Sequence, residues 1–112
     1  MRHLLIALIL GLSAHRPDVT LVMRPSFLFP GSEVRLQIRI RYADSDRWIQ
    51  VDWDPDTVGN SRWPVSPSDR SSWEIWRRLD RPGVYSARAS VGHGSTIRAS
   101  AIEHVTVKGD EF

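Results

Sequence analysis

The chain has 112 residues, of which 41% are hydrophobic and 25% charged, a size and composition that predict one globular domain. Its 15 Lys and Arg side chains against 13 Asp and Glu leave a formal charge of only +2, which argues against a nucleic-acid-binding protein. The absence of cysteine excludes thiol catalysis, cysteine-based zinc sites and iron–sulfur clusters. The core must therefore be stable without disulfides.

The first 14 residues have the composition of a secretory signal peptide. A basic start at Arg2 precedes the apolar run Leu4–Leu12, and the small residue Ala14 follows. We predict cleavage near Ala14, a secreted or periplasmic location, and a mature domain over residues 15–112. The run is too short to span a bilayer. If it is retained, we expect it to act as a short apolar anchor and to be the only route to a membrane; an apolar edge strand is the other alternative.

Beyond this segment, apolar residues recur at every second position, which is the period of half-buried β-strands. Glu33–Tyr42 shows the pattern best, because Val, Leu and Ile at even positions alternate with Glu, Arg and Gln at odd positions. We predict a strand before it at Asp18–Arg24 and another after it at Arg47–Asp54, with Trp53 facing the core. One face of each strand is expected to pack against the core and the other to face solvent.

The second half of the chain continues this pattern. Residues 55–70 are rich in Pro, Ser, Asp and Gly and predict a long loop with a short strand around Trp63. Three further strands are predicted at Ser71–Leu79, Val84–Val91 and Thr96–Lys108. We expect a bulge at Arg77, where a charge breaks the alternation, and an irregularity near Ala101–Ile102. The resulting set of about seven short strands predicts an all-β fold, a single antiparallel β-sandwich.

Short motifs along this pattern carry a resemblance to a known family. They are the run Leu79–Ala87 with its Pro-Gly-Val-Tyr sequence, the turn Pro30–Val34, the closing Val105–Val107 and the third strand bearing Trp53. Together they resemble immunoglobulin-like domains of the polycystic-kidney-disease (PKD) type. The resemblance implies an immunoglobulin-like β-sandwich, in which Tyr85 forms a tyrosine corner by bonding its hydroxyl to a nearby backbone group.

The sequence has no Gly-x-Ser-x-Gly, His-Glu-x-x-His or glycine-rich phosphate loop. We therefore predict that the protein is not an enzyme and binds no cofactor. Asp52, Asp54 and Asp56 are close enough in sequence to form a carboxylate pair or, with Asp44 and Asp46, a calcium site. They lack the spacing of an EF-hand loop, and aspartates of turns and strand ends often bond their own backbone instead.

Histidines offer a second hypothesis for a metal. Cleavage after Ala14 would make His15 the mature N-terminus, with a free amine and an imidazole on one residue, and exported β-sandwiches of the copper-carrier and copper-oxygenase type resemble this arrangement. His93 or His104 is the candidate for a further ligand, because imidazole suits copper. The alternative is that His93 decorates a hairpin tip.

Five tryptophans are more than one small sandwich core holds, so some are expected at the surface. Trp53 and Trp73 face inward by strand parity, which leaves Trp48, Trp63 and Trp76 as surface or loop residues. Exposed aromatic rings stack on sugars, so these three residues predict a carbohydrate-binding surface. The alternative is that Trp63 folds over the end of the sandwich and arginines cover Trp76.

Arg35, Arg39 and Arg41 form a stripe on the polar side of the second strand, and Arg78 joins it if Ser71–Leu79 pairs with that strand. A solvated face that resists aggregation is one interpretation. The functional interpretation is a surface for an acidic glycan, anionic lipid or acidic protein. We predict an exported binding or structural module that acts through a protein–protein surface, with another protein or an extracellular glycan as partner. Carbohydrate binding and copper binding are the alternatives.

Overall fold

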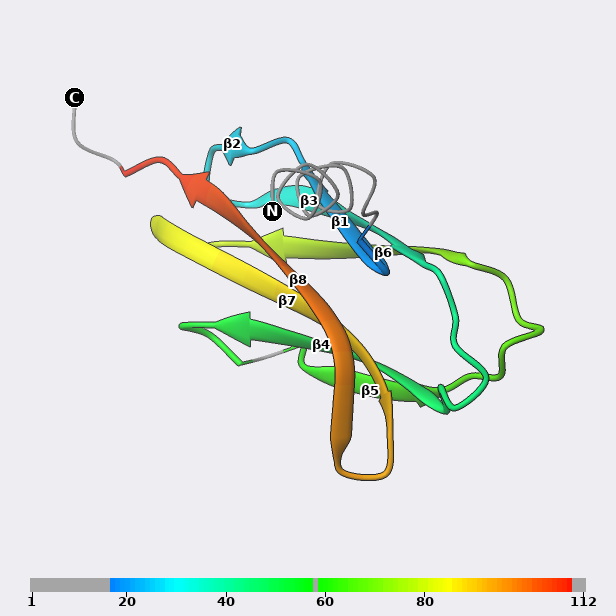
Figure 1. Ribbon diagram of the computed structural model, residues 1–112. Helices are drawn as coiled ribbons and strands as arrows, with labels where there is room; N and C mark the ends of the chain where they lie inside the picture. The colour runs from blue at the N-terminus through cyan, green and yellow to red at the C-terminus, as the bar shows by residue number, and fades with distance from the viewer. Residues whose placement is uncertain (1–16, 58, 110–112) are drawn as a thin grey trace, which may run out of the picture.

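The computed structural model describes residues 17–57 and 59–109. The predicted signal peptide and His15 lie outside these ranges. Within them the chain is all β, and no helix is long and apolar enough to cross a membrane. The strands are β1 (Val19–Arg24), β2 (Phe27–Leu28), β3 (Ser32–Ile40), β4 (Trp48–Asp54), β5 (Ser61–Pro64), β6 (Ser72–Leu79), β7 (Gly83–His93) and β8 (Thr96–Val107) (Figure 1).

Two sheets make up a sandwich (Figure 1). One has three strands in the order β1-β3-β6, and the other has five in the order β2-β8-β7-β4-β5. Every pairing is antiparallel except that of β2 with β8, which is parallel over two residue pairs. The predicted all-β sandwich is confirmed. The sequence pattern missed β2, because a two-residue strand between Pro25 and Pro30 is too short to show an alternation.

The core lies between the sheets and follows the predicted alternation. Val34, Leu36 and Ile38 of β3 are fully buried, and their neighbours in β3 are half-buried or exposed. Trp53 of β4 is buried opposite Ala87 of β7, so a small side chain lies beside the largest ring of the core. Each aliphatic side chain buried in this way stabilises the fold by about 1.5–3 kcal/mol. The core is therefore built without any disulfide, since the chain contains no cysteine.

The predicted bulge at Arg77 is wrong. The β3–β6 register runs without a shift from Ser32–Leu79 to Arg39–Ser72. Arg77 lies on the inward side of β6, with its guanidinium carbon 4.6 Å from the centre of a Trp53 ring and its Nη2 3.1 Å from Oδ2 of Asp56. Arg77 can therefore occupy an inward position of a regular strand, because its guanidinium stacks on the Trp53 ring and pairs with the Asp56 carboxylate at the edge of the core.

The irregularity of the last strand lies nearer its start than predicted. The β7–β8 register is continuous through Ala101 and Ile102 and shifts between Val91 and Gly92. Val91 pairs with Ala99 and Gly92 with Ile97, so Arg98 is the extra residue of a β-bulge. Sequence parity pointed to the wrong place because the residue in the bulge is polar and leaves no break in the apolar pattern.

The tyrosine corner is present. Tyr85 is buried, and its hydroxyl donates a 2.8 Å hydrogen bond to the carbonyl oxygen of Arg81, four residues earlier. This bond fastens the turn between β6 and β7 to the core, the role implied by the resemblance to immunoglobulin-like domains.

Candidate ligand-binding face

The candidate site is the outward side of the three-stranded sheet, which we call the basic face. Its side chains alternate with those of the core along β1, β3 and β6, so strand parity alone places them outside. The residues that form it are Thr20, Val22, Arg24, Glu33, Arg35, Gln37, Arg39, Ser72, Glu74, Trp76 and Arg78.

The strand registers place these side chains in rows across the sheet. Arg24 of β1 lies beside Arg35 of β3, and Arg35 lies beside Trp76 of β6. Glu33 lies beside Arg78, which confirms the expectation that Arg78 joins the arginine stripe. Two of the sequence predictions, an exposed tryptophan and a row of arginines, thus meet on one face.

Two arginines of the basic face are free of ion pairs within the described residues. Arg24 and Arg39 line a hollow of about 180 Å³ together with Thr20, Val22 and Gln37. The guanidinium of Arg35, by contrast, lies 3.8 Å from Glu74, and that of Arg78 lies 2.8 Å from Asp80. These exposed pairs are weak, because water and salt screen them. Because Arg24 and Arg39 are exposed and lack ion pairs among the described residues, the hollow has two cations facing solvent.

Of the three tryptophans predicted at the surface, Trp76 is the one that is exposed. Its residue is 56% exposed. The guanidinium carbon of Arg35 lies 5.9 Å from its ring centre, at the outer limit of a cation–π contact, so the ring is not covered. The exposed indole is therefore available to a ligand.

Trp48 does not have the predicted exposure. It lies on the outward side of β4 by parity, yet it is only 6% exposed. Its ring is capped by the guanidinium of Arg62 at 4.0 Å, and its Nε1 donates to the carbonyl oxygen of Gly94 in the β7–β8 turn at 3.0 Å. Gly92 leaves room for this arrangement, because a Cβ there would meet the Trp48 ring. Trp48 is therefore no platform for a sugar.

Trp63 is half-buried rather than open. It lies in β5 and packs against the core, with its ring centre 5.5 Å from that of Trp73 in β6. Its Nε1 is buried without a hydrogen-bond partner among the described residues. The contact closes the edge between the two sheets, so the alternative in which Trp63 packs onto the sandwich accounts for this residue.

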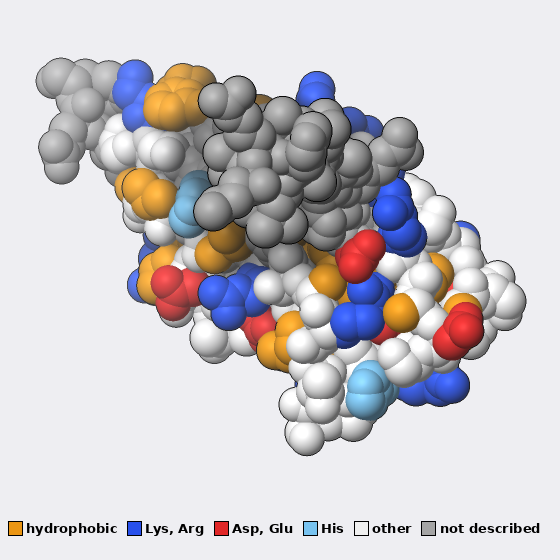
Figure 2. Space-filling model, in the orientation of Figure 1, with side chains coloured by type: hydrophobic (Ala, Val, Ile, Leu, Met, Phe, Trp, Pro, Cys, Tyr) orange, Lys and Arg blue, Asp and Glu red, His pale blue; other side chains and the backbone are white. Residues whose placement is uncertain are grey.

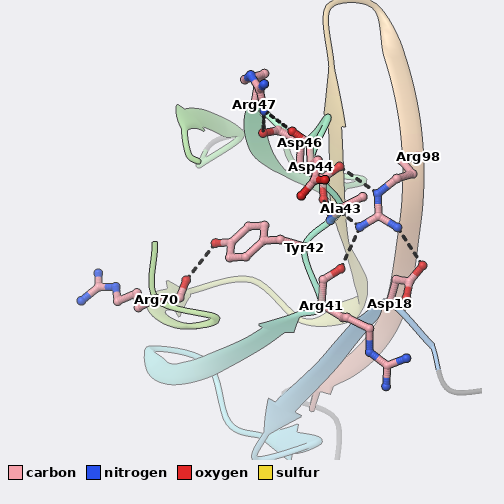
Figure 3. Close-up of polar contacts among 9 residues, drawn as sticks. All are labelled: Asp18, Arg41, Tyr42, Ala43, Asp44, Asp46, Arg47, Arg70 and Arg98. Carbon is pink, nitrogen blue, oxygen red and sulfur yellow. Dashed lines mark hydrogen bonds and ion pairs between the residues drawn. The ribbon is translucent and has the colours of Figure 1, made fainter. Parts of the chain in front are cut away.

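Arg41 belongs to a different cluster from Arg35 and Arg39. It follows the end of β3 and is exposed, and its carbonyl oxygen accepts a 2.8 Å bond from Nη2 of Arg98 (Figure 3). Arg98 also donates from Nε and Nη2 to the two carboxylate oxygens of Asp46, and from Nη1 to Asp18 at 2.7 Å (Figure 3). We call Asp18, Asp46 and Arg98 the ionic cluster. It joins the residue before β1, the β3–β4 loop and the β8 bulge.

Within the ionic cluster, the pKa of Asp46 is lowered and that of Arg98 is raised. Burial alone would raise the pKa of the Asp46 carboxyl. Hydrogen bonds from Arg98 and the Ala43 amide, with the charge of Arg98, outweigh burial and hold this pKa below its ordinary value of 3.8. The hydrogen bond to Asp46 raises the pKa of Arg98. Both carboxylate oxygens of Asp46 are thus hydrogen-bonded to Arg98, so this side chain is not placed as a calcium ligand.

A second polar contact fastens the same end of the sandwich. Tyr42 donates from its hydroxyl to the carbonyl oxygen of Arg70 at 2.8 Å (Figure 3) and accepts from Nε1 of Trp73 at 3.1 Å. Burial raises the pKa of the Tyr42 hydroxyl. These bonds hold the long loop before β6 against the end of β3.

The aspartates proposed for calcium do not converge. Asp52 accepts from the side-chain amide of Gln50, Asp54 is exposed at the end of β4, and Asp56 pairs with Arg77. Across the described part of the chain, no group of three or more His, Asp or Glu side chains is arranged to hold a metal ion.

The two described histidines lie far apart. His104 pairs with Ser86 of β7, and His93 lies seven positions further along the same strand, about 23 Å away at about 3.3 Å per residue. Figure 2 shows histidine side chains at separate places on the surface, among hydrophobic and charged side chains that are intermixed. One copper ion cannot take both as ligands, and His15 lies outside the described residues.

Comparison with known proteins gives the fold. No family model and no curated protein matches the chain. Several solved structures are similar to it. One is the sulfur carrier protein SoxY from Chlorobium limicola f thiosulfatophilum, with a TM-score of 0.65 and 14% identity; the match covers 93% of this chain and 96% of that chain. Another is the CARDB domain of a Pyrococcus furiosus protein, with TM-score 0.54, 16% identity and coverages of 81% and 93%. A superoxide reductase (neelaredoxin) from Ignicoccus hospitalis follows, with TM-score 0.57, 14% identity and coverages of 81% and 80%.

These likenesses show a β-sandwich of the immunoglobulin-like type. At such low identities they carry the fold alone, because one fold hosts many unrelated functions. The function has to be argued from the surface of this chain.

Proposed function

We propose that this protein is an exported, non-enzymatic binding module that holds an acidic ligand on its basic face. The observation that carries the proposal is the hollow between β1 and β3, which is flanked by Arg24 and Arg39 with no ion pair to either among the described residues. Guanidinium groups bind carboxylates through two parallel hydrogen bonds. An unpaired arginine at a surface is thus ready for an acidic group.

The composition of the whole face supports the same ligand chemistry. Four arginines and two glutamates lie on it, an excess of positive charge on a chain whose formal charge is only +2. Trp and Arg are also the residues that contribute most to binding at interfaces. An acidic protein or an acidic glycan fits both the positive charge of the face and its exposed tryptophan.

Binding to acidic polymers tests the proposal. Poly-L-glutamate and polygalacturonate are immobilised, and the dissociation constant is measured at low and at physiological salt. The variant Arg24→Glu/Arg39→Glu should bind about tenfold more weakly or worse, because two attractive contacts become repulsive. Arg88→Glu, which reverses an exposed charge on the other sheet, is the matched control and should bind as the wild type does. No binding of either polymer, or an equal loss in the control, would contradict the proposal.

Export is tested on the protein itself. Intact mass and N-terminal sequencing of material recovered from its native compartment should show a mature chain that starts at or near His15, as the sequence of residues 1–14 predicts. A start at Met1 would mean an anchored or retained protein, and it would also remove the terminal copper site that requires a free amine at His15.

A further inference from the structure

The row Arg24–Arg35–Trp76 has the chemistry of a site for an acidic sugar. It runs across β1, β3 and β6 and spans two strand spacings, about 10 Å. The exposed indole of Trp76 lies at one end, and at the other lies the guanidinium of Arg24, which has no ion pair among the described residues. This is the length of a short oligosaccharide laid across the strands.

Each part of the row matches one part of such a ligand. The electron-rich face of the Trp76 ring attracts the C–H groups on the apolar side of a sugar ring. Arg24 and Arg39 bind a carboxylate at the hollow between β1 and β3. Gln37 lines that hollow and both donates and accepts hydrogen bonds, as sugar hydroxyls require.

The size of the basic face favours a glycan over a protein surface. Its eleven outward positions, about 4.8 Å apart across the strands and about 6.6 Å apart along them, cover roughly 350 Å² in projection. A standard protein interface buries about 800 Å² on each partner. The face is also almost entirely polar, with Val22 and Trp76 as its apolar side chains, so it lacks the apolar centre that protein interfaces have.

We infer that the basic face binds a short stretch of a uronic-acid polysaccharide, with one sugar ring on Trp76 and a neighbouring carboxylate between Arg24 and Arg39. This inference rests on the proposed function and names its ligand class. Trp76 distinguishes the inference from the proposed function, because its ring stacks on a sugar, whereas arginines bind any acidic group.

The experiment compares polymers that differ in one property. Polygalacturonate is the acidic sugar polymer, its methyl-esterified form has the same sugars without the charge, and poly-L-glutamate has the charge without sugars. Binding of the full chain is measured by isothermal titration calorimetry. Polygalacturonate should bind, and the esterified form should bind about tenfold more weakly or worse, because the carboxylate contacts are lost.

Trp76→Ala carries the decisive arm. It should weaken polygalacturonate binding by about tenfold and leave poly-L-glutamate binding within about twofold, because only the sugar stacks on the ring. Phe29→Ala is the matched control, since Phe29 is 57% exposed and lies outside the basic face. It should change neither.

The failures are distinct. If poly-L-glutamate binds as tightly as polygalacturonate and Trp76→Ala affects neither, the ligand is an acidic protein; the inference falls and the proposed function stands. If the esterified and acidic forms bind equally, the carboxylate contact is refuted. If no acidic polymer binds, both the inference and the proposed function fall.

Discussion

Arg98 and Asp46 lie 52 residues apart in the sequence, yet two nitrogens of the Arg98 guanidinium each donate a 2.8 Å hydrogen bond to one oxygen of the Asp46 carboxylate. Asp46 is fully buried, and the side chain of Arg98 is 21% exposed. The β8 bulge provides the geometry, because the extra residue redirects its side chain toward the β3–β4 loop. This pair joins the two sheets at one end of the sandwich.

Removing Arg98 should strongly destabilise the fold. Among the described residues, Arg98→Met leaves the Ala43 amide as the one hydrogen-bond donor to the buried carboxylate of Asp46, and we expect a loss of about 3 kcal/mol in the free energy of unfolding. Urea unfolding followed by tryptophan fluorescence measures it. Arg88→Met, an exposed substitution on the neighbouring strand, should stay within about 0.5 kcal/mol. A loss of the same small size in Arg98→Met would show that the ionic cluster adds no stability.

Stability should also fall at acidic pH through Asp46. Its folded pKa is lowered below 3.8, so the folded state favours the carboxylate more than the unfolded chain does. The contribution is then fully present above the unfolded value and is lost as pH falls through the folded pKa. We expect unfolding free energies measured from about pH 6 to about pH 2 to decline below about pH 4. Asp46→Asn should flatten that decline, and an unchanged pH profile in the variant would contradict this assignment.

Much of the fold could be predicted from the sequence because alternation is a local signal. The segment Glu33–Tyr42 shows period two in every residue, and β3 forms there. The ionic cluster could not be predicted, because Asp18, Asp46 and Arg98 are ordinary polar residues until the bulge brings them together. Long-range pairing of this kind leaves no periodicity in the chain.

The candidate site was predicted in part, for a related reason. Parity placed Arg35, Arg39 and Trp76 on the outward side correctly, since it depends only on the strand. Parity also placed Trp48 outward, and its burial comes from Arg62 and the β7–β8 turn, which lie far from it in the sequence. Strand parity therefore predicts direction, while exposure depends on neighbours that only the fold supplies.

Gly92 should be intolerant of any side chain. A Cβ there would lie 2.0 Å from the carbonyl oxygen of Thr96 and 3.0 Å from the Trp48 ring, so the hairpin or the ring has to move. We expect Gly92→Ala to cost about 1–3 kcal/mol or more. Gly94→Ala is the control: its φ of +54° disfavours alanine, but a Cβ there would meet no described residue within 4 Å other than its chain neighbours, so about 1 kcal/mol is expected. Thermal or urea unfolding of both variants checks this order, and equal losses would contradict the clash.

The tyrosine corner should make a smaller contribution. Tyr85→Phe keeps the buried ring and removes only the hydroxyl that donates to the carbonyl oxygen of Arg81. A loss of about 1 kcal/mol follows from one intramolecular hydrogen bond. Urea unfolding measures the loss. If the slope of the unfolding free energy against urea concentration is unchanged, the loss is due to this bond rather than to a change in the unfolded state. A gain in stability would show that the bond does not restrain the turn.

Fluorescence quenching should separate the tryptophans by exposure. Trp76 is 56% exposed, whereas Trp48 and Trp53 are buried and Trp63 and Trp73 are half-buried, so acrylamide should reach Trp76 most easily. Trp76→Phe should therefore remove most of the readily quenched emission. Arg62→Ala should do the opposite, because it uncovers the Trp48 ring from a guanidinium 4.0 Å above it. If Arg62→Ala left quenching unchanged, the hairpin turn alone would be what shields Trp48.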